Sequence, residues 1–205
     1  MDGSVINGKE AADILQEGRD RFDESASADA ENRTDAAHDL KFLWNYENFQ
    51  WPQDAQKVRK GRPMLVENRL PQFVRQVVNN MRRNRPAINV TPVDSQADPK
   101  TADIMEGLIR HIEQYSRADM AYDEAGKYAV SCGVGYFRIT TEYASEDGFD
   151  QEICIKTIPN PLTVYDDPYT KMPDKSDRRY CFVSEMVKRG EFKAKYGFEP
   201  TAWEA

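Results

Sequence analysis

The sequence predicts an α+β fold, with a long N-terminal helical arm and helices packed on a small antiparallel meander. Apolar residues recur at helical spacing in the first part of the chain, for example from Leu70 to Met81. Two later runs, GYFRITTEY and QEICIKTI, alternate apolar and polar residues, as strands do. These patterns divide the 205 residues into an acidic helical arm over 1–56 and an α+β domain over 57–205, which we expect to be cut short at its C-terminal end.

The arm is long and acidic. Residues 9–48 are expected to be helical, with room for a break in the small and acidic stretch DESASADAENRTDAAHD. Aromatic residues gather between Leu40 and Trp51, and Pro52 closes the segment. Residues 1–40 carry eleven acidic and four basic side chains, a difference equal to the formal net charge of −7 of the whole chain. Such an arm should pack on the body of the domain or on an adjacent subunit.

A basic segment follows the arm, from Lys57 to Val93. It contains nine Lys or Arg residues as far as Arg85, against the single acid Glu67. Local positive charge in an acidic chain needs an anionic partner, either another subunit or nucleic acid. Pairing with the acidic arm, within one subunit or between neighbours, is left open by the charge pattern. The candidate residues at a subunit interface or near DNA are Arg75, Arg82, Arg83 and Arg85.

An amphipathic helix is predicted within this segment, with Asn68 as its N-cap and Pro71 in its first turn. The candidate arginines lie off its apolar face, and the last three suit the negative C-terminal end of the helix. Pro86 should end the helix, and AINV, residues 87–90, should form a short strand. The apolar face, expected to anchor the domain, consists of Leu70, Phe73, Val74, Val77, Val78 and Met81.

Two more helices and a hairpin complete the predicted body. Asp98 and Pro99 should start one helix, and a second should cover about 118–131 and end at Gly133. A turn at residues 146–148 should join the two alternating runs into an antiparallel hairpin. Short strands are expected in PNPLTVYDDP and CFVSEMV, and a short helix in KRGEFKAKYG. The residues expected to face inward on the two helices are Ile104, Leu108, Ile109, Ile112 and Tyr115, then Met120, Ala121, Ala125, Tyr128 and Ala129.

The sequence contains little that predicts catalysis. Gly133-Val134-Gly135 follows a helix and precedes a strand, the reverse of a dinucleotide loop, so a helix stop and a tight strand entry explain it better. Asp166-Asp167 could hold Mg²⁺ for phosphoryl chemistry, although the pair is also a common turn opener. Glu152 and Lys156 are separated by three residues, where restriction-type nucleases have one. No metal site, cofactor or enzymatic activity is therefore predicted.

The histidines and cysteines predict no catalytic or metal-binding site. His38 and His111 both fall in predicted helices, and His111 is expected at the surface. The three cysteines, Cys132, Cys154 and Cys181, lack metal-ligand spacing and are expected to be buried, reduced thiols. No apolar run approaches the roughly 18 residues of a membrane span, so no membrane partner is predicted.

Three segments, in this order, resemble the podovirus-type phage portal proteins typified by the P22 portal. They are RPMLVENRLPQFVRQVVNNMRRNRPAINVTPVD, then ADIMEGLIRHIEQYSRADMAYDEAGKYAVSCGVGYFRITTEY, then IKTIPNPLTVYDDPYTK. Together they cover most of residues 62–173. The ordered set includes an Arg-Pro strand entry, a Gly-x-Gly-Tyr strand start and an Asn-Pro…Asp-Pro turn.

The resemblance implies a structural protein of the virion and not an enzyme. Members of the family form a dodecameric ring at one capsid vertex, assembled in the host cytoplasm, through which double-stranded DNA is packaged and ejected. The implied partners are further copies of the chain, terminase, capsid and tail proteins, and the DNA in the channel. This chain resembles the N-terminal part, mainly the peripheral wing. A nucleic-acid-binding or metal-dependent nuclease module stays open as the alternative, as does a capsid-associated scaffold.

Overall fold

A computed structural model of the protein describes residues 8–93, 98–145, 148–172 and 175–199. Helices dominate, and the strands pair antiparallel, so the predicted α+β class is confirmed. Contacts group the chain into two units, one formed by residues 30–161 and the other by residues up to 29 together with those from 162 onward. The predicted boundary between residues 56 and 57 stays a prediction.

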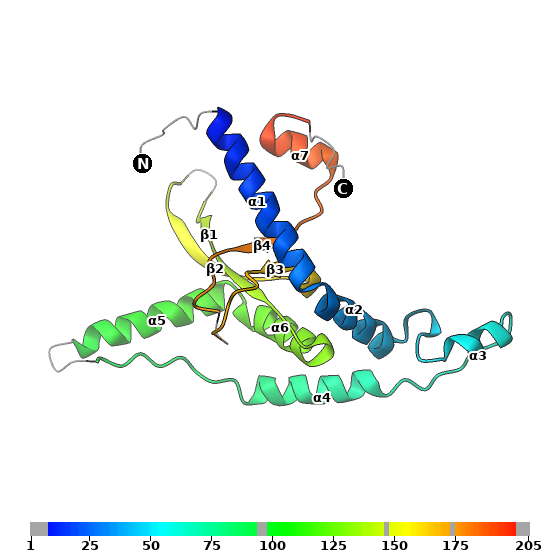
Figure 1. The fold of residues 1–205 in the computed structure, drawn as a ribbon. Coiled ribbons are helices and arrows are strands. Elements are labelled where there is room, and N and C mark those ends of the chain that lie inside the picture. The colour runs from blue at the N-terminus through cyan, green and yellow to red at the C-terminus, as the bar shows by residue number, and fades with distance from the viewer. Residues whose placement is uncertain (1–7, 94–97, 146–147, 173–174, 200–205) are drawn as a thin grey trace. The chain divides into compact units, whose positions relative to one another are not determined.

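The unit of residues 30–161 contains most of the helices and the hairpin (Figure 1). The long N-terminal helix is broken at Asp29, as its composition allowed, into α1 (Gly8–Ala28) and α2 (Ala30–Trp44). Only α2 belongs to this unit. After it come a 3₁₀ turn (Tyr46–Asn48), α3 (Gln53–Val58), α4 (Leu70–Arg83), α5 (Pro99–Tyr115), α6 (Ala118–Cys132), β1 (Phe137–Tyr143) and β2 (Gln151–Thr157).

Helix α6 is the centre of this unit, because α2, α4, α5 and β2 all pack against it. Its small residues allow this: Ala118 and Ala121 form the core with Ile155 of β2, and Ile112 and Tyr122 cover them. Gly126 lies under Met81 of α4, in a position where a β-carbon would meet the methionine methyl group. The helix then ends at Gly133, which has the positive φ expected of a C-terminal glycine.

The predicted hairpin is confirmed, with β1 and β2 in register from Phe137 opposite Thr157 to Tyr143 opposite Gln151. The predicted turn residues Glu146 and Asp147 lie outside the described residues. Gly135 explains how the strand begins so close to the helix. A β-carbon there would lie 1.8 Å from the Ala125 carbonyl oxygen, so only glycine lets the chain pass over α6. The tight strand entry predicted for the Gly-Val-Gly sequence is thus confirmed.

The second unit contains α1, a short strand pair and a terminal helix. A 3₁₀ turn at Pro161–Thr163 leads into β3 (Val164–Asp166), which pairs with β4 (Cys181–Val183) in a separate two-stranded sheet. Phe22 of α1 packs on Tyr165 and Phe182, with ring centroids 4.5 and 5.7 Å away. Helix α7 (Arg189–Tyr196) forms where KRGEFKAKYG predicted it.

Asn68 lies one position before the N-cap residue Arg69, and its side-chain oxygen accepts from the Leu70 amide at 3.3 Å, so the predicted contact with the start of α4 is present. Its amide group also donates to the Leu43 carbonyl oxygen at 2.7 Å. Two other details of the prediction are wrong, each because a non-local contact decides the outcome. Residues 87–90 form no strand, because no described segment pairs with them and prolines flank them. Met120 and Ala129, both expected to face inward, are exposed, because the side of α6 that packs against Ile155 of β2 is the one with Ala118 and Ala121.

The apolar faces of α4 and α5 are also less buried than predicted. On α4 only Val78 is buried, while Leu70, Phe73, Val77 and Met81 are exposed. On α5 the exposed residues are Ile104, Leu108 and Tyr115, although the predicted cap by Asp98 is confirmed through its 3.1 Å bond from the Lys100 amide. One layer of helices and one hairpin offer too little surface to cover both faces. Apolar surface of this extent marks a site of contact with other molecules.

Candidate subunit interface

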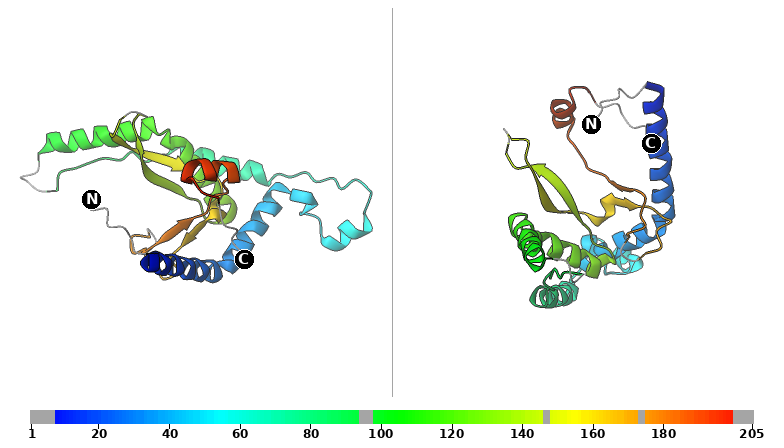
Figure 2. Two further views of the ribbon diagram at one scale, coloured as in Figure 1. Left: turned by 90° about the horizontal axis from the view of Figure 1, so that it is seen from above. Right: turned by 90° about the vertical axis from the view of Figure 1, so that its left-hand side faces the viewer.

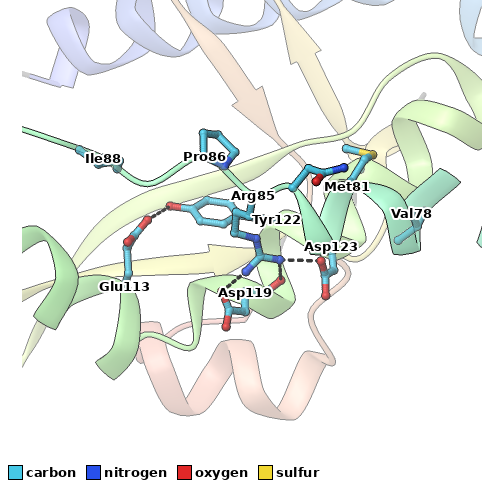
Figure 3. Close-up of a pocket in the computed structure, with 11 residues that line it drawn as sticks. Val78, Met81, Arg85, Pro86, Ile88, Glu113, Asp119, Tyr122 and Asp123 are labelled. Carbon is cyan, nitrogen blue, oxygen red and sulfur yellow. Dashed lines mark hydrogen bonds and ion pairs between the residues drawn. The ribbon is translucent and has the colours of Figure 1, made fainter.

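The four arginines singled out by the sequence lie on and just beyond α4, and the structure divides them into two pairs. Arg82 and Arg85 bind aspartates of α6, which the sequence did not identify as their partners. The Arg82 Nε donates to Asp123 at 2.8 Å. Arg85 donates to Asp123 at 2.7 Å and also pairs with Asp119 (Figure 3). These contacts fasten the end of α4 to α6.

Tyr122 of α6 also contacts this cluster of charged residues. The Arg85 guanidinium lies 5.7 Å from the ring centre of Tyr122, a cation–π distance, and the tyrosine hydroxyl donates to Glu113 at 3.0 Å. Burial, followed by the bond to Glu113, raises the pKa of Tyr122. A pocket of about 460 Å³ opens beside these groups, between α4, α6 and the chain that follows α4, and its apolar wall includes Met81, Pro86 and Ile88 (Figure 3).

Arg75 and Arg83 differ from the other pair. Both are exposed, and within the described residues neither side chain makes a hydrogen bond or an ion pair. They share α4 with the exposed apolar residues Phe73 and Val77. An exposed helix with unpaired cations and uncovered apolar side chains can bind an acidic protein surface through both kinds of contact.

The chain between α2 and α4 forms an ordered projection, which we call the basic arm and define as residues 53–69. Its base is closed by two amide side chains, since Gln50 donates to the Phe42 carbonyl oxygen at 2.8 Å and to Asn68 at 3.1 Å, while Asn68 donates to Leu43. These contacts could not be predicted from the sequence, because the partners lie 8 to 25 residues apart. Within the unit of residues 30–161, the basic arm extends away from α5 and α6 (Figures 1 and 2).

Two carboxylates of the nuclease interpretation, Asp166 and Asp167, pair with basic side chains. Both oxygens of Asp167 accept from Arg179, at 2.8 and 3.3 Å, and Asp166 accepts from Arg178 at 2.9 Å. Lys156 pairs with Glu142 across the hairpin. Among the residues that the structure describes, no group of three or more His, Cys, Asp or Glu side chains is placed to hold a metal ion. The arrangement accounts for these charges as internal ion pairs.

The cysteines and histidines lie largely where the sequence predicted. Cys132 and Cys154 are buried and Cys181 is half-buried, and all three are free thiols. Burial, with a contribution from Asp166, raises the pKa of Cys181 to about 11. His111 is exposed on α5. Each helix in the described ranges is too short or too polar to cross a bilayer.

Comparison with known proteins agrees with the family resemblance of the three sequence segments. The family model described as phage P22-like portal protein matches residues 19–205. A portal protein from Acyrthosiphon pisum secondary endosymbiont phage 1 is 29% identical over 142 residues, which cover 67% of this chain and 20% of that protein. The chain thus spans about a fifth of the length of this curated relative. With nearly all of its helices and both of its sheets inside the matched region, the chain belongs to the phage P22-like portal protein family.

Proposed function

We propose that this chain is part of the portal ring at one vertex of a tailed-phage capsid, the ring through which double-stranded DNA is packaged and ejected. The observation that carries this proposal is the family match over residues 19–205. The uncovered apolar faces of α4 and α5 support it, because a ring subunit buries such surface against its neighbours. Twelve copies of the chain, terminase, capsid and tail proteins belong to the proposal as partners, as does assembly in the host cytoplasm.

Immunogold labelling of virions tests this role directly. Antibodies raised against the chain should mark one vertex of each opened particle, at the point where the tail attaches. Label at every vertex would indicate a capsid component, and absence from purified particles would indicate a scaffold or a free nucleic-acid-binding protein. Either result would contradict the proposal.

We further propose that Arg75 and Arg83 contact the neighbouring subunit, and that Arg82 and Arg85 shape this surface from within the chain. The exposure of the first pair and the aspartate bonds of the second support this division. Reversing the first pair with Arg75→Glu and Arg83→Glu in the assembling portal protein should weaken the association of subunits by roughly tenfold or more, because like charges would then face each other.

Native mass spectrometry over a range of protein concentrations measures this effect. The matched control is Lys100→Glu with Lys195→Glu, which makes the same change in net charge at two other exposed helical positions. Rings that assemble equally well with both variants would place Arg75 and Arg83 outside the interface. A variant that assembles normally but loses salt-dependent DNA binding in a filter assay would place them near DNA instead.

A further inference from the structure

The basic arm combines internal order with an uncovered surface. Besides the amide contacts at its base, Gln56 donates to the carbonyl oxygens of Asn48 and Trp51, at 3.1 and 2.8 Å. Arg59 donates to the Pro63 carbonyl oxygen at 3.1 Å and lies 5.3 Å from the ring centre of Trp51. The arm is therefore held in one conformation before any partner binds, which lowers the entropy cost of binding.

Its outer surface offers both apolar area and charge. Val58 is 81% exposed and Leu65 is 85% exposed. The arm carries five basic residues against Asp54 and Glu67, and within the described residues Lys60 and Arg62 make no ion pair. A surface of this kind fits a partner that has apolar side chains next to an excess of carboxylates.

Helix α1 has this complementary surface. Asp13, Glu17, Asp20 and Glu24 are spaced by four, three and four residues and so form one stripe along the helix, which we call the acidic stripe. Ile14 is exposed beside the stripe, near the N-terminal end of the helix. Glu17 already pairs with Arg21, but Asp13 and Asp20 have no cationic partner in the described part of the chain. Phe22, on another side of α1, faces the rings of its own unit.

We propose that the basic arm of one copy of this chain binds the acidic stripe of α1 in a second copy. The inference rests on the proposed ring, because a closed ring is built from contacts between two different surfaces of identical subunits. Lys60 and Arg62 lie against Asp13 and Asp20 of the neighbour. Val58 and Leu65 cover Ile14. The contact repeats once per subunit around the ring.

Disulfide trapping in assembled rings tests which chains meet. Leu65→Cys combined with Ile14→Cys should give, after mild oxidation, a ladder of covalent multimers on a non-reducing gel. The control pair, Phe149→Cys with Ile14→Cys, combines two exposed positions outside the proposed contact and should give no ladder. The buried Cys132 and Cys154 and the half-buried Cys181 set the background, which the unsubstituted protein measures. A cross-link confined to single chains, or no cross-link in intact rings, would overturn the proposal.

Charge exchange gives a second, independent test. Lys60→Glu with Arg62→Glu should weaken subunit association by roughly tenfold, and adding Asp13→Lys with Asp20→Lys should restore most of the loss. All four positions are exposed, so circular dichroism should show unchanged folding. Loss without restoration would overturn the arm–stripe contact. Rings that still form, and still label at one vertex, would then leave the portal function intact while this contact fails.

Discussion

Replacing Gly135 with alanine should lower the free energy of unfolding of the 30–161 unit by roughly 2–4 kcal/mol. The added β-carbon would lie 1.8 Å from the Ala125 carbonyl oxygen and 2.7 Å from its carbon. Both are backbone atoms in the middle of α6, so no side-chain rotation relieves the clash. Either α6 must bend or the start of β1 must move away from it, and β2 would follow through the hairpin.

Two other glycines serve as matched controls in a urea titration followed by circular dichroism. Gly126→Ala would meet only the methyl end of Met81, which can rotate, so its cost should be much smaller. Gly107→Ala, on α5, meets nothing within 4 Å and should stabilise the unit by about 0.5–1 kcal/mol through helix propensity. If Gly135→Ala unfolded no more readily than Gly126→Ala, the close passage of β1 over α6 would be refuted.

The parts of the fold that the sequence could predict are those set by local signals. Helix stops, proline starts and the alternation of strands are signals contained within a few residues, and α5, α6 and the hairpin formed where those signals lay. Asn68 carried a local signal too, and its oxygen accepts from the Leu70 amide, but the bond from its amide to a carbonyl group 25 residues earlier could not be predicted. Residues 87–90 had strand-forming side chains but no partner strand, and pairing is a non-local property.

At the candidate interface too, the local signals could be predicted from the sequence and the non-local contacts could not. The arginines stood out by composition alone, since nine bases gather in a chain with an acidic total. Their partners did not, because Asp119 and Asp123 become neighbours of Arg82 and Arg85 only when α4 packs on α6. The exposure of Phe73 and Val77 was equally hidden, since an amphipathic stripe has the same pattern whether its cover is the same chain or another subunit.

The contact between Asp167 and Arg179 should have the largest effect in the second unit. Asp167 is 2% exposed and accepts from the Arg179 side chain and from the amides of Tyr169 and Arg179. Arg179 also lies 5.3 Å from the ring centre of Tyr169, whose hydroxyl donates to Glu24 of α1 at 2.6 Å. Asp167 thus organises the loop between β3 and β4. The hydrogen bond from Tyr169 to Glu24 joins this loop to α1.

Arg179→Met should therefore lower the melting temperature of this unit by roughly 5 °C or more, because the buried Asp167 carboxylate would lose its counter-charge. Asp166→Asn is the matched control, since Asp166 pairs with the half-exposed Arg178 and with Lys175 at 3.9 Å and should cost less. Differential scanning calorimetry measures both variants. Equal melting temperatures for Arg179→Met and wild type would show that the loop is held by other contacts.

The Asp167 carboxylate should make the second unit less stable as the pH falls. The hydrogen bonds from Arg179, more than any other contact, hold the pKa of Asp167 well below its usual range. A carboxyl group with a lowered pKa in the folded state contributes stability that is fully present above its unfolded pKa, about 3.9, and is lost as the pH falls toward the folded value. Asp167→Asn should therefore melt well below wild type at pH 7, and this gap should narrow steadily below about pH 4. A gap that stayed constant down to pH 2 would mean that the pKa of Asp167 is the same in the folded and unfolded protein, and its bond to Arg179 would then carry no charge-dependent stability.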